Sequence, residues 1–310
     1  MSDDDHDDVD DGSLVARGDS ERLFLLVCVF VLGACGLVYE LVAGATASYL
    51  MGDSVTQYSL VIGMFLSAMG VGSQLTRWVR NDLLGAFIAT QLAVAFTGGF
   101  SAFLLFAAFP VVESLTAVVL IVVFVIGTFI GMELPLLIRL LREGATLRIN
   151  LAHAMSFDYI GALLASIAFP FVLLPQLGLV RASLASGIFN LIVAATCTLL
   201  FRDRLPRFKA LVAANTAVFV ALVLGFVVAD RATSLLEDSL YQDEIILAET
   251  TPYQRIVVTR WREDIRLHLN GHLQFSTADE YRYHESLILP ALSYIAPSNN
   301  DGLRVLLLGG

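Results

Sequence analysis

The chain has 310 residues, of which 57% are hydrophobic and only 15% are charged, and its formal net charge is −10. Soluble domains carry roughly a quarter of charged residues, so this composition excludes an ordinary soluble globular protein and favours a helical membrane protein with a small polar part. All three cysteines, Cys28, Cys35 and Cys197, lie in apolar stretches, so neither a disulfide framework nor a metal site is expected.

Residues 1–22 form an acidic N-terminal segment. Aspartates crowd the stretch from Asp3 to Asp11, with few apolar side chains to bury, and they predict a solvated, disordered tail. The apolar run that follows lacks both a basic leading segment and a small-residue cleavage site. We therefore expect a retained membrane helix there and not a removed signal peptide.

Residues 23–230 predict a multi-pass transmembrane domain. A helix needs about 20 apolar residues to cross a bilayer, and seven stretches are long enough: Leu23–Ala43, Thr56–Leu75, Leu84–Phe109, Ser114–Leu140, Ser156–Leu174, Arg181–Phe201 and Ala210–Ala229. Glycines recur inside them, as at Gly70, Gly72, Gly127 and Gly131, and allow helices to approach closely. Arginines in alternate loops place the N-terminus inside the cell, so that seven spans would place the C-terminal part outside.

Three acidic residues lie inside these spans: Glu40, Glu133 and Asp158. A carboxylate in hydrocarbon costs about 3 kcal/mol or more, so the three predict a polar site within the membrane. Pro135 loosens the helix next to Glu133 and frees backbone carbonyls there. The alternative for Glu40 and Asp158 is a position at the membrane interface, where a charge is cheap. If the three acids converge, they suit a path for a cation or a polyamine.

Residues 231–300 predict a small β domain followed by a helix. After Arg255, apolar residues alternate with charged ones, as half-buried strands require: Ile256, Val258, Ile265, Leu267 and Leu269. Asn270-Gly271 predicts a tight hairpin turn, with Leu273–Phe275 as the returning strand. Acidic residues from Asp279 onward predict a helix start. Residues 301–310 are typical of a buried parallel strand that runs into a glycine turn.

These C-terminal segments resemble the spermidine synthase family, the polyamine aminopropyltransferases. The matching pieces, in order, are Tyr253-Gln254, Leu269-Asn270-Gly271 with Gln274, Asp279-Glu280, Tyr283-His284-Glu285, Pro290-Ala291-Leu292 and Val305–Gly310. The family usually has Asp where Asn270 stands, a change that the turn tolerates. Val38–Leu41 and Gly52–Leu60 resemble the membrane region attached to some prokaryotic spermidine synthases.

The resemblance implies both a fold and a chemistry. The fold is mainly α: a seven-helix transmembrane bundle, then a small β-hairpin domain and the first strand of a truncated Rossmann-like, methyltransferase-type domain. The activity is transfer of an aminopropyl group from decarboxylated S-adenosylmethionine, the co-substrate, to putrescine, giving spermidine, with no permanently bound cofactor. Gln254 is implied on the nucleoside side of the site, and Tyr283 with His284 in the polyamine pocket. Without the resemblance, Gln254 would be interpreted as an exposed strand residue, and Tyr283 and His284 as part of one face of an amphipathic helix.

The family's catalytic aspartate lies further along than Gly310, so we expect the chain alone to be inactive, with its catalytic residues unidentified. The expected partners are putrescine or another polyamine, the lipid bilayer and a second copy of the chain, and no binding of nucleic acid is expected. The protein is expected to be a multi-pass protein of the cell membrane. The family's aminopropyl donor is cytoplasmic, which conflicts with an outward C-terminal part. Two alternatives stay open: a transporter or channel for cations or polyamines that uses the intramembrane carboxylates, and a membrane scaffold.

Overall fold

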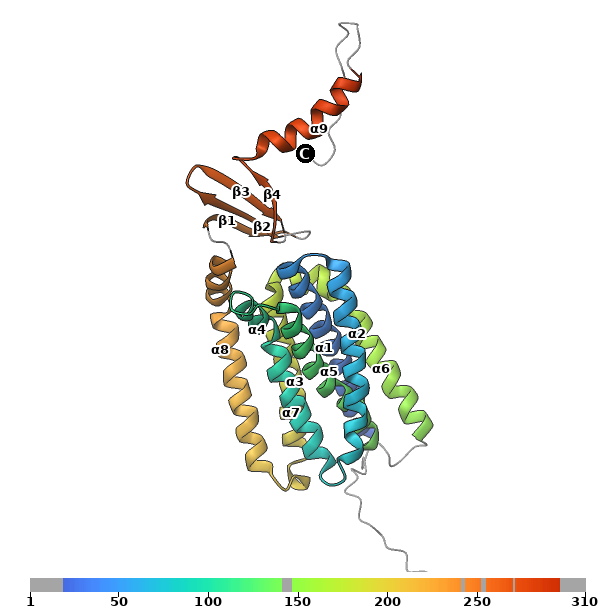
Figure 1. Cartoon of the computed structure of the whole chain (residues 1–310). Coiled ribbons are helices and arrows are strands. Elements are labelled where there is room, and N and C mark those ends of the chain that lie inside the picture. Colours follow the sequence, from blue (N-terminus) through green and yellow to red (C-terminus); the bar gives the residue numbers. More distant parts are fainter. Residues whose placement is uncertain (1–18, 141–146, 241–242, 252–254, 270, 296–310) are drawn as a thin grey trace, which may run out of the picture. The chain divides into compact units, whose positions relative to one another are not determined.

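The computed structural model describes residues 19–140, 147–240, 243–251, 255–269 and 271–295 (Figure 1). The chain divides into two compact units, which are treated separately below: a helical unit, Met1–Gln242 with Thr250–Gln254, and a β unit, Asp243–Glu249 with Arg255–Gly310. Gln254 and residues 301–310, for which a site residue and a further strand are predicted, lie outside the described residues.

The described part of the helical unit consists of helices joined by short turns. They are α1 (Asp19–Met51), α2 (Ser54–Leu75), α3 (Leu83–Gly99), α4 (Ser101–Ala108), α5 (Leu115–Leu140), α6 (Leu147–Ala168), α7 (Leu174–Leu200) and α8 (Phe208–Leu240). Asp53 and Asp82 begin α2 and α3 as N-caps, each accepting a backbone N–H from three residues ahead. These caps explain why both helices start directly after a turn.

The predicted seven-helix bundle is wrong. Among the described residues, five helices are long and apolar enough to cross a membrane, or six if a bent pair counts as one span. The bent pair is α3 with α4, which break at Phe100 by 40° inside the predicted span Leu84–Phe109. The predicted spans Ser156–Leu174 and Arg181–Phe201 fall in one apolar helical stretch, Leu151–Leu200, which is broken at Gly178, where the backbone leaves the helical conformation with φ 68°. Hydropathy registers the length of an apolar stretch but not where the helix bends, and this explains the error.

Glycines set the closest helix contacts, as their spacing predicts. A Cβ at Gly72 of α2 would run into the Thr128 carbonyl of α5, and one at Gly131 of α5 would run into the Met69 backbone. A Cβ at Gly127 would come within 2.9 Å of the Ala68 Cβ. Gly70 has open space around it, so its glycine serves no such contact.

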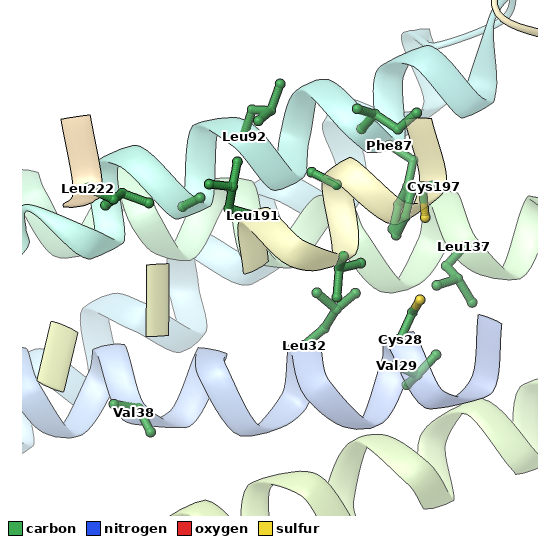
Figure 2. Packing of buried hydrophobic residues seen from close by; sticks show 14 of the residues in the cluster. Cys28, Val29, Leu32, Val38, Phe87, Leu92, Leu137, Leu191, Cys197 and Leu222 are labelled. Carbon is green, nitrogen blue, oxygen red and sulfur yellow. The ribbon is translucent and has the colours of Figure 1, made fainter. Parts of the chain in front are cut away.

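The core of the helical unit is built from buried aliphatic side chains of several helices. Figure 2 shows residues from α1, α3, α5, α7 and α8 that pack in one cluster: Cys28, Val29, Leu32, Val38, Phe87, Leu92, Leu137, Leu191, Cys197 and Leu222. All three cysteines are buried and free, as expected from their apolar surroundings. The cluster therefore ties helices that are distant in sequence into one packed body.

The β unit contains a four-stranded sheet in the order β1-β2-β3-β4. Its strands are β1 (Glu244–Thr250), β2 (Arg255–Trp261), β3 (Asp264–Leu269) and β4 (His272–Ser276), and α9 (Glu280–Ile295) follows. The expected tight connection between β3 and β4 is confirmed by pairing of Leu269 with His272, and Gly271 has φ 82°; Asn270 itself lies outside the described residues.

The sheet differs from the predicted hairpin in two respects. A second tight turn lies between β2 and β3, where Trp261 pairs with Asp264 and Arg262 takes the left-handed φ of 59°. The phase of the apolar alternation shifts at this turn, so β2 buries Val257 and Thr259 instead of Ile256 and Val258. Every residue of β2 from Ile256 to Val258 is apolar, so periodicity alone could not select its buried face.

Candidate functional site

The β unit has one concentrated polar centre, the carboxylate of Asp264 at the start of β3. Its side chain is 8% exposed. Oδ1 accepts hydrogen bonds from the hydroxyls of Ser276 and Thr277, at 2.8 and 2.9 Å, and from the Ala278 backbone N–H at 2.9 Å. Oδ2 accepts one from Arg266 Nε at 2.7 Å. The carboxylate thereby joins β3 to the end of β4 and to the turn that leads into α9.

Arg266 extends this polar centre. Its Nη1 donates to Asp243 Oδ2 at 2.8 Å, and its guanidinium lies 5.2 Å from the centre of the Trp261 ring. The hydrogen bonds from Ala278 and Arg266 lower the pKa of Asp264 far below its ordinary value, and the hydrogen bond to Asp264 raises the pKa of Arg266. Burial, together with the positive charge of Arg266, lowers the pKa of His268. The start of β3, an interior strand, is thus held by an ion pair that stays charged over a wide pH range.

The lowered pKa of Asp264 predicts how the β unit responds to acid. Because the folded state holds this carboxylate deprotonated, its contribution to stability is complete above the unfolded pKa of about 3.9 and is lost as pH falls below it toward the folded value. We expect the β unit to keep its full stability down to about pH 4 and to unfold in more acidic solution. Trp261 fluorescence in a Trp78→Phe background measures this, since the chain has only 2 tryptophans. Unfolding centred near neutral pH would contradict the prediction.

His284 is the predicted polyamine-site residue whose side chain the structure describes. It lies on α9, with Nδ1 3.3 Å from Glu280 Oε1 one turn earlier, and both side chains are 48% exposed. Its ring centroid is 6.5 Å from that of Phe275 on β4. Tyr283 belongs to the same helix, but its side chain, like all of Gln254, lies outside the described residues. The assignment of these three residues to a substrate site therefore stays a prediction.

The structure brings two of the three predicted intramembrane acids near one another. Glu133 on α5 is 4% exposed, and the charge of Asp158 on α6 acts on it. The α1 side chains that interact electrostatically with Glu133 are those of Cys35 and Tyr39, whereas no such interaction with Glu133 is found for the half-buried Glu40. Consecutive residues on a helix point about 100° apart, so Tyr39 and Glu40 cannot face the same partner. This polar site, too, stays a prediction with respect to function.

Three residues of these polar centres are missing from the sequence-based prediction: Tyr39, Gln91 and Asp264. Gln91 is buried on α3, and its amide lies beside Glu133. A glutamine in the middle of an apolar span is a visible signal of the same kind as Glu133. Asp264 gives no such signal, because one aspartate among the charged residues of a half-exposed hairpin is ordinary.

The fold and these polar groups define a class of protein: an apolar helical unit, whose helices have the length and composition of membrane spans, followed by a small antiparallel β unit.

The chain is 45% identical over 287 residues, 92% of its length, to the polyamine aminopropyltransferase of Leptospira interrogans. It is 46% identical over 96% of its length to polyamine aminopropyltransferase 1 of Ralstonia nicotianae, and 38% identical over 93% to that of Mycobacterium tuberculosis. Over nearly its whole length, the chain is thus similar to curated proteins named polyamine aminopropyltransferase.

The match covers most of this chain but only part of each relative. The chain spans 57%, 56% and 56% of the length of these three proteins. No family model matches the chain, and no solved structure matches it. The names of the relatives agree with the resemblance seen in the sequence motifs and do not support the transporter alternative.

Proposed function

We propose that the protein carrying this chain is a polyamine aminopropyltransferase that makes spermidine from putrescine. The observation that carries the proposal is the identity of 45% over 92% of the chain to a protein of that name. In the reaction, the unprotonated amine of putrescine attacks the aminopropyl methylene of decarboxylated S-adenosylmethionine. The carbon–sulfur bond breaks, methylthioadenosine leaves with the bonding electron pair, and the secondary ammonium formed by the attack releases a proton to give the amine.

The residues of this chain have binding roles in the proposal. Gln254 contacts the nucleoside side of the donor, and Tyr283 with His284 lines the polyamine pocket. In-line attack requires both reactants to be held at near-contact distance, and loss of one positioning group costs up to about 100-fold in rate. The support for His284 is its place on α9 within the motif shared with the family, next to the carboxylate of Glu280.

We expect His284→Ala to lower kcat/KM for putrescine by about 10-fold to 100-fold in the protein that carries this chain. The measurement is release of methylthioadenosine from decarboxylated S-adenosylmethionine. His272→Ala, which removes an exposed strand histidine of the same unit, is the matched control and should keep wild-type activity. Absence of methylthioadenosine release from the unaltered protein would overturn the proposed function, and equal effects of the two variants would overturn the role of His284.

We propose further that the protein is a multi-pass protein of the cell membrane. The support is the length and apolar composition of helices such as α1, α2 and α5, which exceed the roughly 20 residues that a crossing requires. Large apolar side chains also remain exposed along these helices, among them Leu66, Ile121 and Phe124. Retention in the membrane pellet after an alkaline carbonate wash is the expected result, and release into the supernatant would contradict it.

A further inference from the structure

Among the described residues, buried side-chain oxygens without a hydrogen-bond partner occur on five helices of the helical unit, and three of these oxygens lie on Glu133 or on its neighbours. These atoms are Tyr39 Oη on α1, Gln91 Oε1 on α3 and Glu133 Oε1 on α5. The three side chains are 1%, 0% and 4% exposed. Buried polar groups in native proteins are nearly always hydrogen-bonded, so three such atoms in one unit call for an explanation.

The three side chains belong to one place. The Gln91 amide is a hydrogen-bonding neighbour of Glu133, although neither of its polar atoms has a hydrogen-bond partner within 3.5 Å among the described residues. Tyr39 and Cys35, one turn apart on α1, are both electrostatic neighbours of Glu133. Helix α5 packs against both α1 and α3. The backbone at Gly98 lies directly against the Tyr39 ring and fixes its position.

The set of free atoms specifies the chemistry of an occupant. Apart from the Gln91 Nε2 donor, which faces Glu133, three possible acceptors remain, one of them on a carboxylate. They match a group that carries a positive charge and three N–H donors, which is a primary ammonium. Magnesium and calcium take six or more oxygen ligands, and the described residues contain no group of three or more His, Cys, Asp or Glu side chains that could hold a metal ion. Apolar neighbours of Tyr39 in the same cluster, such as Val94 and Ile130, suit an alkyl chain.

We propose that Tyr39, Gln91 and Glu133 form a binding site for the primary ammonium group of a small alkylamine inside the helical unit. The carboxylate supplies the countercharge, and each of the three oxygens accepts one N–H. Asp158, which acts electrostatically on Glu133, offers a second negative charge for the far end of a diamine. The site lies in the helical unit and does not rest on the proposed transferase activity.

Ligand-dependent thermal unfolding of the purified, detergent-solubilised protein tests the proposal. A thiol-reactive dye reports specifically on the helical unit, because all three cysteines are buried there. We expect methylammonium and putrescine to raise the unfolding temperature at constant ionic strength. Tetramethylammonium and sodium, which have no N–H donor, should leave it unchanged. If the two amines raise the unfolding temperature equally, the ligand of the site is a monoamine or an ammonium ion. If putrescine raises it more, the ligand is a diamine. Either result supports the site.

Two substitutions and a control identify the residues. Glu133→Gln should abolish the amine-dependent shift, and Tyr39→Phe, which removes only the hydroxyl, should weaken apparent affinity about tenfold. Tyr159→Phe, at a tyrosine that is 62% exposed on α6, should bind as the wild type does. If Glu133→Gln does not fold, Tyr39→Phe decides. The proposal is overturned if the folded Glu133→Gln variant or Tyr39→Phe shows an amine-dependent shift in unfolding temperature as large as that of the wild type. It is also overturned if tetramethylammonium gives the same shift as the amines, or if neither amine gives a shift.

Discussion

We expect Gly72→Ala to lower the unfolding temperature of the helical unit by roughly 5 to 10 °C, since overpacking costs about 1 to 3 kcal/mol. The added methyl group would collide with the Thr128 carbonyl of α5, which is backbone and cannot rotate away. The two helices would have to separate along a contact that also includes Gly127 and Gly131. The thiol-reactive dye measures the change, because the cysteines become accessible only when the helical unit opens.

Gly70→Ala is the matched control for this prediction. Gly70 lies two residues earlier on the same helix, and nothing stands within 4 Å of the position that its Cβ would occupy. Alanine favours helix over glycine by about 1 kcal/mol, so this variant should unfold at the wild-type temperature or slightly above it. If both variants lost the same stability, the α2–α5 contact would not be the cause.

We expect Asp264→Ala to be the most damaging single change in the β unit, with a fall in its unfolding temperature on the order of 10 °C. The substitution removes the Asp264 acceptor from the hydroxyls of Ser276 and Thr277, from the Ala278 N–H and from Arg266 Nε, while Arg266 Nη1 keeps its bond to Asp243. Donors stranded in a half-buried environment cost more than the hydrogen bond itself contributes. The strand end and the turn into α9 should separate first.

Trp261 fluorescence in the Trp78→Phe background measures this loss, because Trp261 belongs to β2 and Trp78 to the helical unit. Trp78 is 65% exposed, so its replacement by Phe should be tolerated. Asp279→Ala is the control, since the ion pair of Asp279 with Arg282 is exposed at 58% and 71% and such pairs contribute about 1 kcal/mol or less. If Asp279→Ala lowered the unfolding temperature of the β unit as much as Asp264→Ala, the hydrogen bonds of Asp264 would not be the cause of the loss.

Much of the architecture was accessible from local patterns. The apolar composition, the turn at Asn270-Gly271 and the start of α9 near Asp279 depend on residues close in sequence, where side-chain periodicity and turn chemistry are sufficient. The family resemblance was also accessible, because it rests on short motifs in a fixed order. The buried face of β2 was not, since both faces of that strand carry apolar residues and only pairing with β3 selects between them.

Sequence alone was enough to predict apolar helices followed by a small β unit, to locate Glu133 and Asp158 in apolar helices, and to find the resemblance to polyamine aminopropyltransferases. It could not count the helical spans correctly, because the bend at Phe100 and the break at Gly178 within Leu151–Leu200 are features of the backbone that hydropathy does not register. Nor could it show that Tyr39 and Gln91, and not Glu40, accompany Glu133. Which side chains meet in a bundle depends on the rotation of each helix about its axis, and that rotation is set by the contacts of the whole fold.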